Sequence, residues 1–363
     1  MENQQVQINQ HMLALAREYR QITQTELAKS SGVSQGLISQ IEGGVVTSCA
    51  SDVADRIANT LSFPVTFFGL VGERLGFGSS ALFYRGNKKS FTAQQRRMIS
   101  AKVNLHRLSL KRMLDVVDVD APMALRRPTD ETANPEQAAA LVRARWNMPT
   151  GAINNLTSFI EKSGVVIIEC DFAGTIAGTS MWLAELPPII FIDANLKADR
   201  YRFTLAHELG HLVMHEVPGE TMEDEADAFA SALLLDRTDF FAMTRPFCPR
   251  PTLRQLSQIR PYWKVSIHAM IETLYRAEMI TGDVRRSLYI MMSNYGMRDD
   301  AVPFAKERPG LWPTIFHESF APGTNVGAIA ELLHFPADAV KELFSVSGAE
   351  VPVFGTKPRL KVV

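Results

Sequence analysis

The spacing of hydrophobic positions predicts a bundle of short helices at the start of the chain. Apolar residues recur every three or four positions, the spacing that places them on one face of a helix. The predicted helices cover residues 8–20, 25–30, 34–42 and 50–61, and residues 63–68 close the bundle. Gly32 permits a tight turn between the second and third helices, and Ser34 is placed to cap the third. Two short helices joined in this way predict a helix-turn-helix domain over residues 1–70.

The pattern changes in the middle of the chain, where short β-branched runs lie between helices. Strands are expected at residues 165–170, 179–183 and 188–192, and helices at 135–146, 153–163, 201–215 and 221–235. This order predicts an α+β domain over 134–245, with a small sheet ahead of its central helix. Residues 71–133 are expected to be a basic helical connector and linker. Residues 246–363 are expected to form a helical C-terminal region with a sensory or oligomerising role. The whole chain is therefore expected to be multidomain and mainly α.

The central helix of the α+β domain carries two histidines four residues apart. His207 and His211 lie on the same face of the predicted helix, one turn apart, so both imidazoles can bind one ion. Glu208 lies about 100° around the helix axis, where it can act on water beside that ion. This H-E-x-x-H pattern on an apolar helix favours a zinc hydrolase over two histidines of the core. His215, one turn further on, is expected to lie too far along the axis to share the ion.

A third metal ligand is expected from the next helix, which is rich in carboxylates. Glu225 lies on its apolar stripe, where a carboxylate is costly unless it is paired or bound to metal. We therefore predict Glu225 as the third ligand and keep Glu223 as the alternative. Two histidines and one carboxylate suit one zinc ion, although manganese is also possible.

The N-terminal bundle resembles the XRE, or lambda-repressor-like, family of DNA-binding domains. The resemblance rests on Thr23–Ala28, Gly32–Gln35 and Ile38–Gly44. It implies that Gln24, Gln35, Gly36, Ser39 and Gln40 face the major groove or its phosphates, and glutamine and serine side chains suit base edges and phosphate oxygens. It also implies a structural ion pair between Arg17 and Glu42, and dimeric binding.

Charge is distributed unevenly around this predicted DNA-binding domain. Residues 1–70 contain four basic and six acidic side chains, which is a weak balance for binding phosphates. The next segment, 74–112, contains ten Lys or Arg and no Asp or Glu. These cations could attract DNA, or they could be the solvated face of a helix over 93–114. The sequence favours neither reading over the other.

Residues 134–236 resemble the ImmA/IrrE family of metallopeptidases. The matching segments are Pro135–Ala139, Leu156–Val165, Pro188–Asp193, Arg202–His215 and Glu225–Leu235. The resemblance implies proteolysis of a partner protein, usually a repressor, under stress or in mobile-element control. It places the metal on His207, His211 and the acidic residue assigned as Glu225, with Glu208 catalytic. Asp236 departs from the family, which usually has proline there.

Composition indicates the compartment of the protein and limits the class of protein it can be. The chain has 363 residues and a formal net charge of −1, and its three cysteines are widely spaced, which indicates a reducing compartment. No membrane span and no signal peptide are expected, so the predicted location is the cytoplasm. We therefore expect a DNA-binding transcriptional regulator with a zinc endopeptidase that cleaves a repressor or similar partner, and we expect a homodimer. The alternatives are a regulator whose metallopeptidase-like domain is a sensor or interaction platform without turnover, and an antitoxin.

Overall fold

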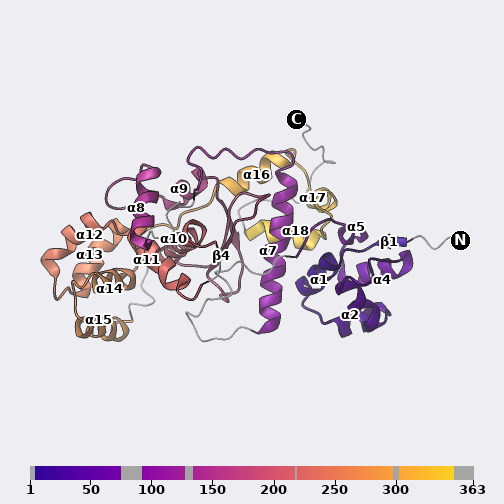
Figure 1. Cartoon of the computed structure of the whole chain (residues 1–363), viewed down its shortest axis with the longest axis horizontal. Coiled ribbons are helices and arrows are strands. Elements are labelled where there is room, and N and C mark those ends of the chain that lie inside the picture. The colour runs from indigo at the N-terminus through magenta and orange to yellow at the C-terminus, as the bar shows by residue number, and fades with distance from the viewer. Residues whose placement is uncertain (1–4, 75–91, 127–133, 217–218, 297–301, 347–363) are drawn as a thin grey trace. The chain divides into compact units, whose positions relative to one another are not determined.

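The structure is a computed structural model that describes residues 5–74, 92–126, 134–216, 219–296 and 302–346 (Figure 1). These residues form two compact units. The first contains 5–74, 92–119 and 312–346, and the second contains the described residues between 120 and 311. The described residues are mainly helical, with small sheets, as the sequence predicted. No helix among them is both long enough and apolar enough to cross a lipid bilayer.

The first unit begins with the predicted five-helix bundle. Its helices are α1 (Gln10–Tyr19), α2 (Gln24–Ser31), α3 (Gln35–Glu42), α4 (Ser51–Leu61) and α5 (Val65–Phe68). Two short strands that were not predicted, β1 (Gln5–Gln7) and β2 (Ser48–Ala50), pair antiparallel beside it. Gly32 ends α2 in the left-handed conformation at φ +64°, and the Ser34 hydroxyl accepts from Leu37 N at the start of α3. The expected ion pair is present, with Arg17 Nε 2.6 Å from Glu42 Oε1.

The C-terminal region does not form one domain, in contrast to the expectation for 246–363. The helices α16 (Leu311–Ser319), α17 (Val326–Leu333) and α18 (Ala337–Val346) fall in the first unit, with α7 (Ala93–Met113) and the N-terminal bundle. Arg20 pairs with Asp338 at 2.5 Å, and the Phe67 and Phe335 rings lie 5.9 Å apart. Their apolar faces are buried in this unit, which gives the short helices a stable position.

The second unit is built around a three-stranded sheet. Its strand order is β3-β5-β4, with β3 (Val166–Cys170) parallel and β4 (Gly178–Met181) antiparallel to β5 (Ile189–Asp193). The helices of this unit are α8 (Pro135–Arg145), α9 (Leu156–Lys162), α10 (Ala198–Met214), α11 (Met222–Leu234), α12 (Arg237–Thr244), α13 (Leu253–Trp263), α14 (Ile267–Arg276) and α15 (Gly282–Asn294). Helix α10 contacts β4, β5 and α11. The sheet and the two helices therefore fix the surroundings of the predicted metal ligands.

Candidate metal centre

Helix α10 presents both predicted histidines toward α11. The two helices pack closely at Gly210, where an added Cβ would lie 3.0 Å from the Phe229 ring. Asp199, in the first turn of α10, pairs with Arg260 at 2.7 Å and places a negative charge at the positive end of the helix dipole. Glu208 and His211 are buried. The predicted buried helix with its H-E-x-x-H face is therefore present.

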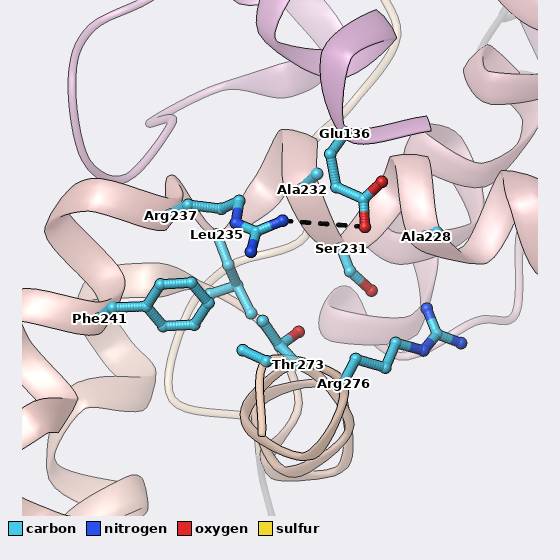
Figure 2. Close-up of a pocket in the computed structure, with 10 residues that line it drawn as sticks. Glu136, Ala228, Ser231, Ala232, Leu235, Arg237, Phe241, Thr273 and Arg276 are labelled. Atoms are coloured by element: carbon cyan, nitrogen blue, oxygen red, sulfur yellow. Dashed lines mark ion pairs between the residues drawn. The ribbon is translucent and has the colours of Figure 1, made fainter. Parts of the chain in front are cut away.

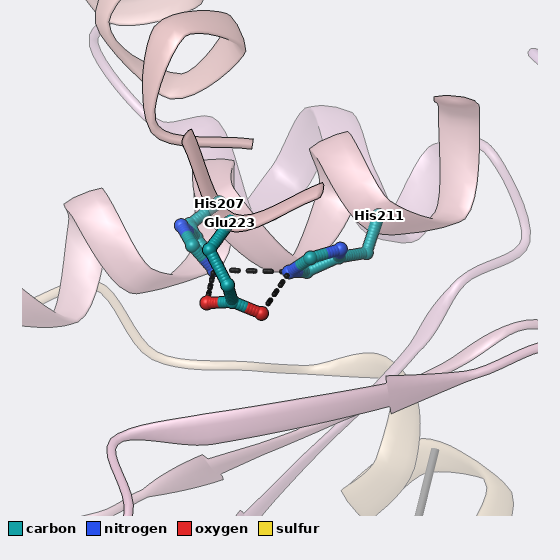
Figure 3. A group of neighbouring side chains, drawn as sticks. All are labelled: His207, His211 and Glu223. Atoms are coloured by element: carbon teal, nitrogen blue, oxygen red, sulfur yellow. Dashed lines mark hydrogen bonds and ion pairs between the residues drawn. The ribbon is translucent and has the colours of Figure 1, made fainter. Parts of the chain in front are cut away.

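Three side chains converge on one point between α10 and α11 (Figure 3). The Nε2 atoms of His207 and His211 lie 3.0 Å apart. The Glu223 carboxylate faces both rings, with Oε2 3.5 Å from His207 Nε2 and Oε1 3.5 Å from His211 Nε2. Glu223 Oε1 is buried and has no hydrogen-bond partner in the part of the chain that the structure describes. Two imidazole lone pairs and an unsatisfied buried carboxylate oxygen aimed at one point fit a zinc ion.

The geometry does not agree with Glu225 as the third ligand. Glu225 Oε2 lies 3.0 Å from His215 Nε2, and its other oxygen accepts from the Thr221 hydroxyl at 2.7 Å. Residues two apart on a helix lie about 200° apart around its axis, so Glu223 and Glu225 cannot face the same point. The apolar stripe of α11 packs on α10, but His207 and His211 lie beside that stripe, on the Glu223 side. The alternative in the prediction, Glu223, occupies the position.

Asp227, for which the sequence predicted no role, contacts the first of the two histidines. Its Oδ1 lies 2.8 Å from His207 Nδ1. An imidazole that binds metal through Nε2 carries its proton on Nδ1, so the ring can donate to this carboxylate, which fixes its tautomer and orientation. Asp227 lies four residues after Glu223, on the same face of α11. That spacing is the signal in the sequence that could have identified the pair.

Glu208 lies on the sheet side of α10, as expected for a residue beside the ligands rather than among them. Its side chain is 3% exposed, and Oε2 accepts a hydrogen bond of 2.8 Å from the Ser180 hydroxyl on β4. Gly178 permits this approach, since a Cβ there would lie 2.9 Å from Thr204 and 3.3 Å from Glu208 Cγ. The strand therefore holds the carboxylate in place.

The electrostatic surroundings of the two histidines differ. Burial lowers the pKa of His207, but hydrogen bonds to Asp227 and Glu223 outweigh that effect and raise it to about 10. Burial, together with the charges of His207 and His215, lowers the pKa of His211 to about 2. The carboxylates around His207 therefore favour a positive charge on its ring. A dication at this point would take over the role of that positive charge.

The predicted DNA-contacting residues lie on α2 and α3 of the N-terminal bundle. Gln35, Gly36, Ser39 and Gln40 are exposed along α3. Gln24 is half-buried and donates to Glu42 at 2.9 Å, while its oxygen accepts from Gln35 at 3.3 Å. The structure therefore brings four of the five to one accessible face and holds the fifth against α3.

Much of the basic run after this bundle has partners inside its own unit. Arg74 pairs with Glu18 at 2.6 Å, Lys102 pairs with Glu342 at 2.7 Å, and Arg112 donates to the Leu332 carbonyl oxygen. Arg96 and Arg97 are exposed on α7. Arg85, Lys88 and Lys89 lie outside the described residues. The run is therefore partly structural, and the described part offers only a few surface cations for phosphate contacts.

A separate small pocket lies among α8, α11, α12 and α14 (Figure 2). Its volume is about 40 Å³, and Ser231, Leu235, Phe241 and Arg276 contribute to its lining. Arg237 pairs with Glu136 across it at 3.9 Å. None of the three converging metal-centre residues lines it. We assign it no role.

Comparison with known proteins gives one family match, which lies within the second unit. Residues 160–275 match the family model described as IrrE N-terminal-like domain, Peptidase_M78. The match runs from α9 to α14 and includes His207, Glu208, His211 and Glu223. The match supports a metallopeptidase-like domain over this segment, in line with the resemblance noted in the sequence. The match does not include the N-terminal bundle, and no curated protein matches the chain.

Proposed function

We propose that the protein is a zinc-dependent endopeptidase that also binds DNA. The observation that carries the proposal is the convergence of His207, His211 and Glu223 on one point, with the carboxylate of Glu208, the residue after His207, buried on the sheet side of α10. A metallopeptidase-like fold around these residues supports the same reading. In this proposal the three converging side chains hold one zinc ion, and manganese is the alternative ion.

The chain's own residues perform the proton transfers of peptide hydrolysis. A bound zinc ion would supply a Lewis acid for the peptide carbonyl and the attacking water. Glu208 accepts a proton from that water and delivers it to the nitrogen of the leaving peptide. The Ser180 hydroxyl, 2.8 Å from Glu208 Oε2, keeps the carboxylate oriented during both transfers.

The substrate is an extended segment of a partner protein. Strand β4 lies at the edge of its three-stranded sheet and carries Ser180, which contacts the general base. An extended peptide that pairs with such an edge would lie across the catalytic residues. We propose that this edge receives the segment to be cleaved.

DNA binding would bring the peptidase close to its substrate. The exposed polar side chains along α3 suit base edges and phosphates, and α3 follows α2 after a tight turn at Gly32, which supports a helix-turn-helix reading. We propose that α3 enters the major groove, that two copies bind together in the cytoplasm, and that the partner cleaved is a repressor.

The experiment compares cleavage by the parent and by Glu208→Gln. Both purified full-length proteins are supplied with zinc and incubated with a soluble proteome, and new N-termini are identified by mass spectrometry. The parent should produce specific new N-termini, which Glu208→Gln should reduce at least ~100-fold because it lacks the proton acceptor. Glu331→Gln, an exposed carboxylate on α17, serves as the matched control and should cleave like the parent. Equal cleavage by parent and Glu208→Gln would favour a regulator whose metallopeptidase-like domain has no turnover.

A further inference from the structure

A second histidine–carboxylate pair lies behind His211, on the side away from the converging ligands. His215 Nδ1 lies 2.9 Å from His211 Nδ1. On the other side of the same ring, His215 Nε2 lies 3.0 Å from Glu225 Oε2. The Thr221 hydroxyl donates to the second oxygen of Glu225 at 2.7 Å and holds that carboxylate in place. The proposed function does not use these three residues.

Both ring nitrogens of His215 are engaged, which excludes it as a metal ligand in this arrangement. Its side chain is 6% exposed, while that of Glu225 is 41% exposed. The pair therefore connects a ligand in the interior to a carboxylate near the surface. This partly buried contact fixes the ring of His215 at the end of α10.

The proton positions on His211 and His215 follow from metal binding through Nε2 of His211. If His211 binds metal through Nε2, its proton must be on Nδ1, and Nδ1 then donates to His215 Nδ1. His215 must consequently carry its own proton on Nε2, where it donates to Glu225. Each of the two contacts has one donor and one acceptor in this assignment, and the carboxylate at the end accepts. Only this pair of tautomers satisfies both contacts with neutral rings.

We propose that His215 and Glu225 are positioning residues that hold His211 with Nε2 directed at the metal and so determine how tightly the metal is retained. The inference rests on the proposed metal centre. Asp227 makes the equivalent contact to His207 directly, at 2.8 Å, whereas His211 reaches its carboxylate through an intervening imidazole. Both imidazole ligands are thereby oriented by a carboxylate of α11.

The test measures zinc affinity of the full-length protein by competition with a chromophoric chelator. His215→Phe keeps a ring but can neither accept from His211 nor donate to Glu225, and it should weaken zinc binding about 10- to 100-fold at unchanged stoichiometry. His215→Gln offers an acceptor oxygen and a donor nitrogen, and it should recover most of the affinity. Glu225→Ala should weaken binding in the same direction. Circular dichroism of each variant verifies that it is folded.

A double-mutant cycle separates positioning from a general structural role. Because Glu225 acts only through His215, Glu225→Ala should add little to the loss caused by His215→Phe. Additive losses, or a His215→Phe protein that binds zinc as tightly as the parent, would overturn the inference and leave the metal centre intact. If His215→Phe fails to fold, Glu225→Ala, at a partly exposed position, decides the question alone. A parent that binds no zinc would overturn the metal centre itself, and the inference with it.

Discussion

Glu223 and Glu225 lie two residues apart on α11 but contact different histidines. Glu223 faces the Nε2 atoms of His207 and His211, and Glu225 contacts His215. A rotation of about 200° between the two positions separates a proposed metal ligand from a proposed positioning residue. At the residue scale, function in this unit is therefore decided by which side of one helix a carboxylate occupies.

His106, in the first unit, should make the protein less stable in acid. It lies on α7, 1% exposed, with its ring 5.8 Å from that of Trp312 and 6.1 Å from that of Phe344. Burial lowers its pKa to about 3, with a smaller contribution from the charge of Lys102. The folded state then binds fewer protons than the unfolded state. The contribution of neutral His106 to the free energy of unfolding is fully present above pH 6.5, the ordinary histidine pKa, because His106 is then neutral in the unfolded state as well. That stability is lost progressively as the pH falls toward 3.

The measurement is the free energy of unfolding of the first unit at pH 7.5 and pH 5.5, for the parent and His106→Leu. Between these two pH values, the parent should lose about 1 kcal/mol of stability that the variant does not lose, because the unfolded state takes up a proton at His106 and the folded state does not. The comparison between proteins removes the contribution of other titrating groups. An identical pH dependence in both would show that His106 is protonated without penalty in the folded state.

Local pattern predicted His207, Glu208 and His211 correctly as residues on a buried helix, because H-E-x-x-H fixes its own geometry within one turn. It did not separate Glu223 from Glu225. Periodicity shows which residues of α11 share a face with apolar neighbours. It does not show which edge of that face meets the imidazoles, because that depends on how α11 lies against α10.

At the element scale, the proposed metal centre depends on the distance between α10 and α11. Gly210 lies at their contact, where a side chain would meet the Phe229 ring and the Ala226 backbone. The packing of β4 against α10 depends in the same way on Gly178, because the missing side chain lets β4 approach Thr204 and Glu208. Two glycines thus permit the close packing that brings Glu223 of α11 and Ser180 of β4 into place beside α10.

Gly210→Val should separate the two helices and weaken the metal centre. We expect a loss of about 1–3 kcal/mol in stability, because the added atoms overfill a packed contact. Zinc affinity should fall with it, since Glu223 moves relative to the imidazoles. Gly36→Val is the matched control, because a Cβ at Gly36 has no heavy atom within 4 Å. Thermal unfolding and chelator competition measure both effects, and equal zinc affinity in Gly210→Val and the control would contradict the account.

The strands and helices of the second unit were largely predictable, because β-branched runs and glycine boundaries mark them locally. The pairing of β1 with β2 was not, since three-residue strands are too short to show a period. The strand order β3-β5-β4 could not be predicted either, because the residues of a strand do not identify the strand that pairs with it.

At the scale of the whole molecule, the chain returns to its first unit after completing its second. Residues 312–346 pack with the N-terminal bundle through contacts such as Tyr19 with Glu342 and His334 with Thr66. Sequence reasoning placed these helices with 246–311 because they follow it. Their apolar faces predict that these helices pack against other elements. A short amphipathic helix does not show which element that is.

DNA binding should depend on α3 and be independent of the peptidase residues. A DNA site selected from a random library by the full-length protein provides the probe for a mobility-shift assay. Gln35→Ala and Gln40→Ala should each weaken binding to it by about 1–3 kcal/mol, the value of one base contact. Glu208→Gln should bind like the parent. Failure to select any DNA at moderate salt, or unchanged binding by both α3 variants, would contradict a DNA-reading role for this helix.

The central claim is that one metal ion is held between α10 and α11 by two imidazoles and one carboxylate. The most direct test is an anomalous difference map, measured at the zinc absorption edge, from crystals of the full-length protein grown with zinc. The account predicts a single strong peak within about 2.0–2.2 Å of His207 Nε2, His211 Nε2 and a Glu223 oxygen. A map with no peak at this position, or a peak coordinated by Glu225 in place of Glu223, would contradict it.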